Sequence, residues 1–118
     1  MRTAVAGLAV AVLLIACGGS SSSQPAGSTM VTMTEFKFAP SSLSVSSGKA
    51  VFWLVNSGTT QHDLAIRDSS GNTVATSELV SVGDQKEFDV NLSAGTYTIF
   101  CSQPGHEASG MKGTLTVT

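Results

Sequence analysis

Short runs of alternating apolar and polar residues, separated by turns rich in glycine and serine, constrain the fold of this chain more than any other feature. Alternation with a period of two places the apolar side chains on one face of a β-strand. One stretch, 73–82, fits a loose strand and a short helix equally well. Strands of this number and spacing predict an all-β fold, an antiparallel Greek-key β-sandwich of seven or eight strands. The predicted strands are 31–38, 43–46, 50–56, 62–67, 85–92, 96–101 and 112–118.

The N-terminal residues do not share this pattern. Arg2 is followed by an apolar run from Ala4 to Ala16, which is too short to span a bilayer as a helix and is typical of a secretory signal peptide. Leu14-Ile15-Ala16-Cys17 resembles a bacterial lipobox, in which the cysteine is lipidated and becomes the new N-terminus. The following Gly- and Ser-rich segment cannot bury a core. We therefore predict a signal peptide at 1–16, a lipidated Cys17 with a flexible linker at 17–29, and one folded domain at 30–118.

Charge and cysteine content narrow the choice of partners. Without the signal peptide, five basic and eight acidic side chains remain, a net charge near −3. The basic residues are not clustered, so we expect no nucleic-acid partner. Lipidation of Cys17 would leave Cys101 without an intramolecular disulfide partner. A free thiol is reactive in an oxidising compartment, so we expect another group to occupy it.

Four side chains with metal-binding chemistry can meet at one end of the predicted sandwich. His62 is in phase with Leu64 and Ile66, and Cys101 is in phase with apolar residues of its own strand, so both should point inwards. His106 and Met111 lie in the loop that leads to the last strand. A trigonal Cys-His₂ site with a weak axial Met is the blue-copper electron-transfer arrangement, whereas thioethers are not among the usual ligands of zinc. We therefore predict one copper ion, cycling between Cu(I) and Cu(II), with the ligands His62, Cys101, His106 and Met111.

The same residues resemble those of the cupredoxins, the type 1 copper proteins, and look most like the auracyanin and plastocyanin-like members. The resemblance covers essentially all of residues 31–118. It is carried by the motif C-x4-H-x4-M from Cys101 to Met111, by Pro104-Gly105-His106 within it, by Tyr97 to Cys101, by Phe36 to Pro40, by Gly48, and by Asn56 to Asp63. It implies the fold predicted above and an electron-transfer role.

The resemblance also implies roles for residues around the ligands. Many cupredoxins carry asparagine after the first ligand histidine, where it ties the two ligand loops together. Here that residue is Asp63, which can accept from Ser102 but cannot donate, so we expect the tie to be rearranged or partly lost. Backbone N–H groups of Asp63 and Gln103 are expected to donate to the Cys101 sulfur, and Asn56 is expected to form a turn. The implied electron portal is a patch of small residues around the second histidine: Pro104, Gly105, His106, Ala108 and Gly110.

We expect an electron shuttle and not an enzyme. Copper oxidases and nitrite reductases need a second copper site with more histidines, and both histidines of this chain are already assigned. A copper carrier or storage protein is the alternative function, and a metal-free interaction module is a third. The predicted partners are redox proteins, a cytochrome or a membrane electron-transfer complex, that dock at the His106 face of a monomer. The predicted location is the periplasmic or outer face of a membrane, with the anchor at Cys17.

Overall fold

The computed structural model describes residues 23–118, so the predicted signal peptide and Cys17 lie outside the described residues. Residues 23–118 form nine β-strands and no helix, and hence no helix that is long and apolar enough to cross a membrane. The strands are β1 Thr29–Thr34, β2 Lys37–Ala39, β3 Ser42–Val45, β4 Gly48–Asn56, β5 Ala65–Arg67, β6 Thr73–Thr76, β7 Gln85–Leu92, β8 Gly95–Phe100 and β9 Lys112–Val117.

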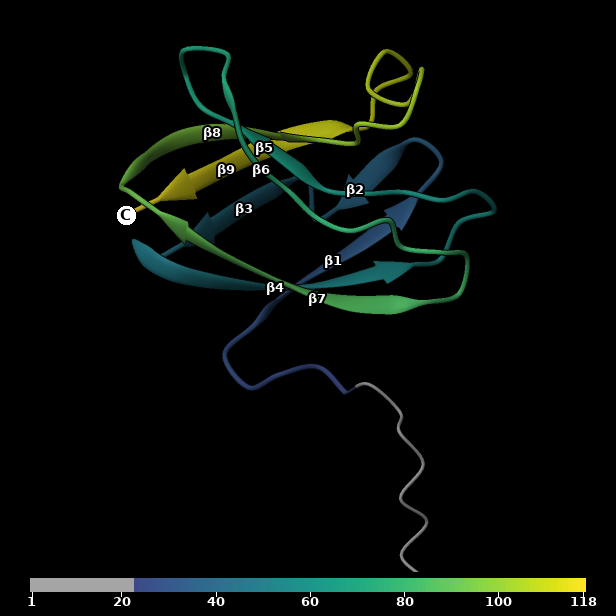
Figure 1. The fold of residues 1–118 in the computed structure, drawn as a ribbon, viewed down its shortest axis with the longest axis horizontal. Helices are drawn as coiled ribbons and strands as arrows, with labels where there is room; N and C mark the ends of the chain where they lie inside the picture. Colours follow the sequence, from purple (N-terminus) through teal and green to yellow (C-terminus); the bar gives the residue numbers. More distant parts are fainter. Residues whose placement is uncertain (1–22) are drawn as a thin grey trace, which may run out of the picture.

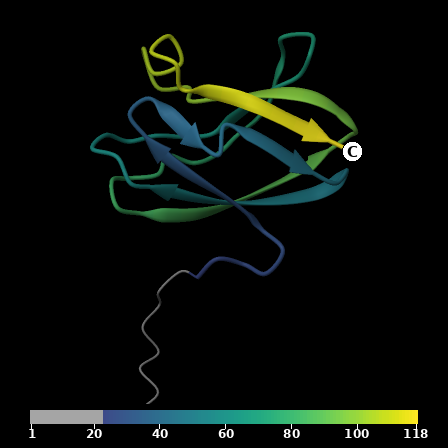
Figure 2. The same ribbon diagram turned by 180° about the vertical axis from the view of Figure 1, so that it is seen from behind.

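The strands form two sheets that pack face to face (Figure 1). One sheet has the order β2-β1-β4-β7 and the other the order β3-β9-β8-β5-β6. The chain leaves β4 to form β5 and β6 in the second sheet, then returns as β7 beside β4, and the same two layers are seen from behind in Figure 2. The predicted all-β sandwich is confirmed.

Two strand pairs depart from the purely antiparallel arrangement that the sequence predicted. β1 runs parallel to β4, and β3 runs parallel to β9. Both pairs join strands that are not consecutive along the chain, so no hairpin turn fixes their relative direction. The consecutive pairs β1–β2, β5–β6 and β8–β9 are antiparallel, as expected.

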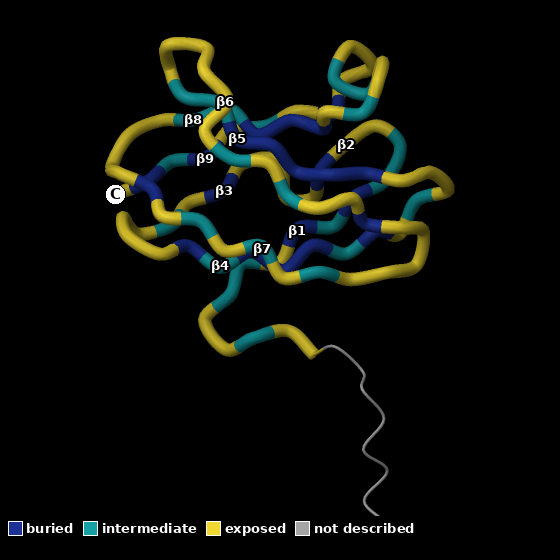
Figure 3. Tube along the Cα trace, viewed as in Figure 1, coloured by how far each residue is buried: buried dark blue, intermediate teal, exposed yellow. Residues whose placement is uncertain are grey.

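The core lies between the two sheets and contains buried residues from every strand except β6 (Figure 3). On β4 the period of two places Ala50, Phe52 and Leu54 in the same cluster as Leu115 of β9 and Ile99 of β8. Complete burial of a large apolar side chain contributes about 1.5–3 kcal/mol. This packing fixes the two sheets relative to each other and thus fixes the loops at their ends.

Three segments differ from the predicted strands. The run 31–38 is a hairpin, β1 and β2, whose turn contains Glu35 and Phe36. The run 62–67 is a strand only from Ala65 onwards, because His62 makes an isolated bridge with Val80 in place of a ladder. The ambiguous stretch 73–82 forms β6 and then irregular chain. Together with the division of 31–38 into two strands, β6 brings the count to nine, above the seven or eight expected.

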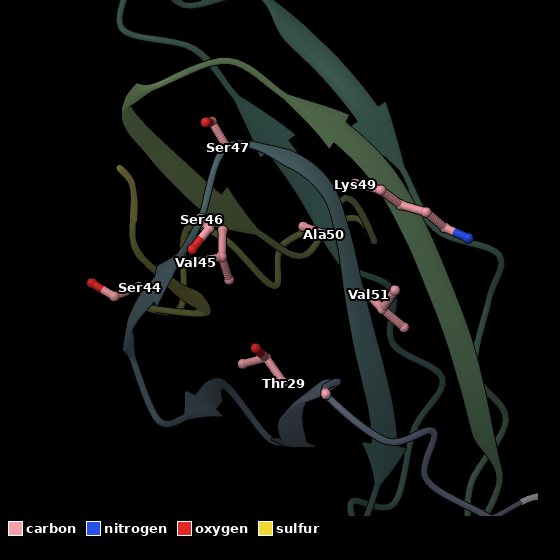
Figure 4. A pocket seen from close by; sticks show the side chains of 9 residues that line it. Thr29, Ser44, Val45, Ser46, Ser47, Lys49, Ala50 and Val51 are labelled. Carbon is pink, nitrogen blue, oxygen red and sulfur yellow. The ribbon is translucent and has the colours of Figure 1, made fainter.

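The two ends of the sandwich have different chemistry. The loop 101–111 joins β8 to β9 at one end. At the other end the Ser47 N–H donates to the Thr118 carbonyl oxygen at 2.7 Å, and a pocket of about 310 Å³ opens between β1, β3 and β4 (Figure 4). Its lining is mainly serine and small apolar residues with Lys49, and includes no histidine or cysteine. The metal-binding chemistry therefore belongs to the end that carries loop 101–111.

Candidate metal centre

His62 is placed by the chain between β4 and β5. Its N–H donates to the Val80 carbonyl oxygen at 3.3 Å, and the Val80 N–H donates to the His62 carbonyl oxygen at 2.8 Å. The side chain is fully buried. The sequence pattern correctly placed this histidine inside the sandwich, in phase with Leu64 and Ile66, both of which are also buried.

Asn56 organises the loop that leads to His62. Its buried amide donates to the carbonyl oxygens of Thr60 and Val80, at 2.8 Å each, and its side-chain oxygen accepts from the Gly58 N–H at 2.9 Å. One amide therefore closes the turn and connects it to the segment that pairs with His62. Asn56 forms a turn, as expected, and also fixes the backbone beside a ligand.

Loop 101–111 closes on itself through backbone hydrogen bonds. The Cys101 N–H donates to the Met111 carbonyl oxygen, and the Met111 N–H donates to the His106 carbonyl oxygen, at 3.1 Å each. Gly105 and Gly110 have φ values of 79° and 109°, a left-handed conformation that glycine adopts at little cost. The three loop residues with metal-binding side chains are thus held by one small bonded unit.

Three donor atoms converge on one point. The Nδ1 atoms of His62 and His106 are 3.2 Å apart, and the Cys101 sulfur lies 3.9 Å from the first and 3.5 Å from the second. Ligands in a trigonal plane, with nitrogen at about 2.0–2.1 Å and thiolate at about 2.3 Å from a metal ion, lie roughly 3.5–3.8 Å apart. The geometry therefore fits one first-row metal ion shared by the three side chains.

Met111 supplies the fourth donor. Its side chain is fully buried, and its backbone forms hydrogen bonds with Cys101 and His106, the other two predicted ligands of the loop. Cys101 is also buried, with 1% of its surface exposed. A thiolate, two imidazole nitrogens and a thioether form the donor set of a type 1 copper centre. The structure brings the first three donor atoms together, and it holds the buried Met111 beside them through backbone hydrogen bonds to Cys101 and His106.

A carboxylate missed by the sequence analysis contacts the outer side of His62. Glu35 Oε1 lies 3.3 Å from His62 Nε2, and it accepts from the N–H groups of Thr59 and Thr60 at 2.6 and 2.8 Å. These bonds, led by that from Thr59, lower the pKa of Glu35 to about 2. Burial lowers the pKa of His62, against the opposing effect of the hydrogen bond to Glu35.

Asp63 connects the two ligand segments. Its carboxylate accepts from the Ser102 N–H at 2.7 Å, from the Ser102 hydroxyl, and from the Gln103 side-chain amide at 3.3 Å. The connection that asparagine makes in many cupredoxins is therefore present here in an accept-only form. The residue is 3% exposed, although strict alternation from His62 would place it on the opposite face of a strand.

The Cys101 sulfur is surrounded by groups that act on its proton affinity in opposite directions. Burial raises the pKa of the thiol and is the largest influence. Backbone N–H groups of Asp63 and Gln103 hydrogen-bond to the sulfur and lower the pKa. The same bonds stabilise negative charge on sulfur, which is the form that binds a metal.

His106 lies at the surface beside exposed small residues. Its side chain is half-buried, whereas Pro104, Gly105, Ala108 and Gly110 are exposed. The sequence analysis missed Phe36 as a member of this surface: its ring centroid is 5.0 Å from that of His106, at an interplanar angle of 65°, and the residue is 38% exposed.

An ion pair holds the outer part of the ligand loop. Arg67 of β5 donates to Glu107 at 2.6 and 3.4 Å, and its guanidinium lies 4.3 Å from the centre of the Phe100 ring. Hydrogen bonding to Arg67 lowers the pKa of Glu107. The residue next to the ligand His106 is therefore fastened to a strand of the sandwich.

A Cys-His₂-Met centre at the end of a two-sheet β-sandwich defines a type 1 copper protein with the cupredoxin fold. Solved structures agree on the fold. Reduced auracyanin from Roseiflexus castenholzii superposes with a TM-score of 0.69 at 21% identity, covering 77% of this chain and 96% of that one. Auracyanin B superposes with a TM-score of 0.70 at 24% identity, covering 82% and 92%.

The chain belongs to the plastocyanin/azurin family of copper binding proteins, whose pattern its residues 25–118 match. The plastocyanin of Dryopteris crassirhizoma is 41% identical over 95 residues, which cover 70% of this chain and 88% of that protein. The plastocyanin of Scenedesmus fuscus is 34% identical over 89 residues, covering 68% and 85%. The family comprises small copper proteins that carry electrons and are not enzymes, and the predicted copper cofactor is confirmed.

Proposed function

We propose that this protein shuttles single electrons between redox partners at the extracytoplasmic surface of a membrane, to which lipidated Cys17 anchors it. The observation that carries the proposal is the convergence of His62, Cys101 and His106 at the end of the sandwich, with His106 reaching the surface. A bound copper ion supplies a one-electron couple between Cu(I) and Cu(II).

The chain's own residues contribute a rigid cage and an exit to the surface. Asn56, Asp63 and the bonded loop 101–111 hold the ligands in place, so that little rearrangement accompanies a change of charge. The edge of His106 is the proposed portal, in a patch formed by Pro104, Gly105, Ala108, Gly110 and Phe36. A small apolar surface of this kind suits brief and weak docking of a cytochrome or a membrane electron-transfer complex.

The alternative, a copper carrier or storage protein, is less compatible with the burial of the site. Transfer of copper to a partner requires ligands that a partner can reach. Cys101 and Met111 are buried, and His62 is fully enclosed. His106 is the only ligand of the four that the structure leaves partly exposed, which supports exchange of electrons over exchange of the ion.

An absorption spectrum of the oxidised, copper-loaded protein tests the proposal. We expect an intense visible band from thiolate-to-copper charge transfer, reversible bleaching by a one-electron reductant, and loss of the band in Cys101→Ser, because a hydroxyl cannot supply the thiolate. Stoichiometric copper without this band would exclude the type 1 site. A blue protein that does not exchange electrons with any redox protein while releasing copper readily to an acceptor would favour the carrier.

A further inference from the structure

The turn between β1 and β2 contacts both copper-binding histidines from outside the ligand set. Glu35 Oε1 lies 3.3 Å from His62 Nε2, and the Phe36 ring packs against His106. Of these two contacts, the one at Glu35 brings a charge to a buried ligand: the His62 side chain has no exposed surface, whereas that of Glu35 is 26% exposed.

The position of the Glu35 carboxylate is fixed independently of the histidine. Oε1 accepts from the N–H groups of Thr59 and Thr60 and from the Thr60 hydroxyl, at 2.6, 2.8 and 3.2 Å. A Cβ atom at Gly58 would lie 2.6 Å from the same oxygen, so the loop approaches the carboxylate as closely as a residue without a side chain allows. The loop 58–60 is thus shaped around this group.

The contact determines which nitrogen of His62 carries a proton. An ionised carboxylate can only accept, so Nε2 must be the N–H that donates to it. The neutral ring then has its lone pair on Nδ1, the atom that lies 3.2 Å from His106 Nδ1 and 3.9 Å from the Cys101 sulfur. Rotation of the ring would leave a buried N–H without this acceptor, which is unfavourable.

We propose that Glu35 is a positioning residue of the copper site, which orients His62 through Nε2 and shifts the copper equilibrium towards Cu(II). A carboxylate that accepts from a ligand imidazole raises the basicity of the ring and therefore its donation to the metal. Cu(II) gains more from this donation than Cu(I), so the carboxylate lowers the reduction potential. The inference rests on the copper site and the electron-transfer role proposed above.

The test compares Glu35→Gln with the wild type, each as copper-loaded mature protein. Glutamine keeps the size of the side chain and an oxygen that can accept, but removes the charge. We expect the blue band to remain, the Cu(II)-to-Cu(I) ratio at a fixed potential to fall about tenfold, and hence the midpoint potential to rise by about 59 mV for a one-electron couple. Glu87→Gln, at an exposed position of β7, removes the same charge elsewhere and should leave the potential nearly unchanged.

A second readout follows the proton itself. In the diamagnetic Cu(I) form, the His62 Nε2–H should give a downfield NMR signal that exchanges slowly with water in the wild type and faster in Glu35→Gln. Gly58→Ala is the second variant: it displaces the carboxylate without changing the charge, and we expect a smaller shift of the potential in the same direction. If Glu35→Gln does not fold, Gly58→Ala decides the question alone.

The possible failures are distinguishable. Wild-type protein without the blue band overturns the copper function, and with it the effect of Glu35 on the potential. Faster exchange of the Nε2–H in Glu35→Gln would then still support the orientation of His62 by Glu35. A blue wild type whose potential and Nε2–H exchange are matched by the folded variants overturns the role of Glu35 and leaves electron transfer standing. A shift of the same size in Glu87→Gln overturns it as well, because the effect would then be one of net charge.

Discussion

At Cys101, hydrogen bonds as well as burial act on the sulfur. Backbone N–H groups of Asp63 and Gln103 bond to it and withdraw electron density. Cu(II) depends on thiolate donation more than Cu(I), so we expect these bonds to raise the potential, in opposition to the effect proposed for Glu35. The carboxylate of Glu35 and the N–H groups at Cys101 are therefore expected to shift the potential in opposite directions.

Gln103→Pro tests the contribution of the second N–H. Proline has no N–H, so one donor to the Cys101 sulfur is lost. If the bond differs between the two copper states by about 1 kcal/mol, the potential falls by about 40 mV for a one-electron couple. Voltammetry of the blue variant measures this change.

The control for that variant is Gln103→Ala. It keeps the N–H and removes the side-chain amide that donates to Asp63, and we expect a much smaller shift. Equal potentials for Gln103→Pro and the wild type, with the same absorption spectrum, would mean that this N–H does not influence the sulfur. An altered spectrum would instead indicate that the proline distorts the loop.

At the scale of elements, an ion pair between Arg67 of β5 and Glu107 connects the ligand loop to the second sheet. Arg67 and Glu107 are each about a third exposed, at 29% and 35%, and Arg67 also lies over the Phe100 ring. Such a partly exposed pair contributes about 0.5–1 kcal/mol. Because Glu107 follows the ligand His106 in the chain, the ion pair restricts the ligand loop even though its free energy is small.

Glu107→Gln should show the contribution as a dependence on pH. The pKa of Glu107 in the fold is lowered from 4.5 by Arg67. A lowered pKa means that the stabilisation is present above about pH 4.5 and is lost as the pH falls through the value in the fold. The difference in free energy of unfolding between the copper-free wild type and Glu107→Gln, from urea titrations, should be about 0.5–1 kcal/mol at pH 7 and should shrink as the pH falls below about 4.5. A difference that stays constant over this range would show that the charge of Glu107 is not its source.

The strands and the ligands were predictable from the sequence because each depends on a local pattern. Alternation found the buried phases of β7, β8 and β9, the nearly continuous apolar run 50–56 found β4, and the spacing from Cys101 to Met111 found the loop ligands. The β1–β2 turn was missed, although the alternation changes phase between Met33 and Phe36, which is the signal of a break. Without that turn, Glu35 and Phe36 could not be placed near the histidines.

Alternation and local spacing could not predict contacts between loops that are distant in the sequence. The partners of Glu35 are 24 to 27 residues away, and those of Asp63 are 39 and 40 residues away. Neither carboxylate lies in a recurring spacing with its partners. The resemblance and hydrogen-bond chemistry together anticipated that Asp63 accepts from Ser102, but the third donor, the Gln103 side-chain amide, could not be anticipated.

At the scale of the whole molecule, the chain enters the domain beside the middle of β4, where Thr29 pairs with Phe52, whereas β4 ends at Asn56 beside the His62 segment. Gly27 and Thr29 line the pocket at the end of the sandwich where Ser47 bonds to Thr118, whereas loop 101–111 lies at the other end (Figure 1). Before β1, the Ser28 hydroxyl donates to the Pro25 carbonyl oxygen at 2.6 Å, and β1 begins at Thr29, one residue before the boundary expected from the sequence.

The proposed anchor predicts how the protein distributes in a cell. Wild-type protein made in a bacterial host should be found in the membrane fraction and in the detergent phase, and Cys17→Ala should block lipidation and alter processing of the signal peptide. Mass spectrometry of the mature N-terminus checks the modification. An unmodified wild-type N-terminus at a residue other than Cys17 would exclude the lipoprotein.

The position of the chain entry also predicts the orientation of the copper centre on a membrane. About eleven residues of Ser- and Gly-rich chain have a root-mean-square reach of roughly 17–20 Å, so an anchored domain stays near the lipid surface. Because the chain enters beside Lys49 to Phe52 of β4, away from the ligand loop, the His106 face should point away from that surface. Stopped-flow reduction by ascorbate should therefore have nearly the same rate constant for wild-type protein on neutral vesicles and for residues 23–118 in solution.

Neutral lipid is the appropriate choice, since an anionic surface would repel the reductant and slow the reaction for an unrelated reason. A strong slowing on neutral vesicles, reversed when detergent dissolves them, would show instead that the lipid covers the His106 face, and a partner would then have to reach the copper from within the membrane surface.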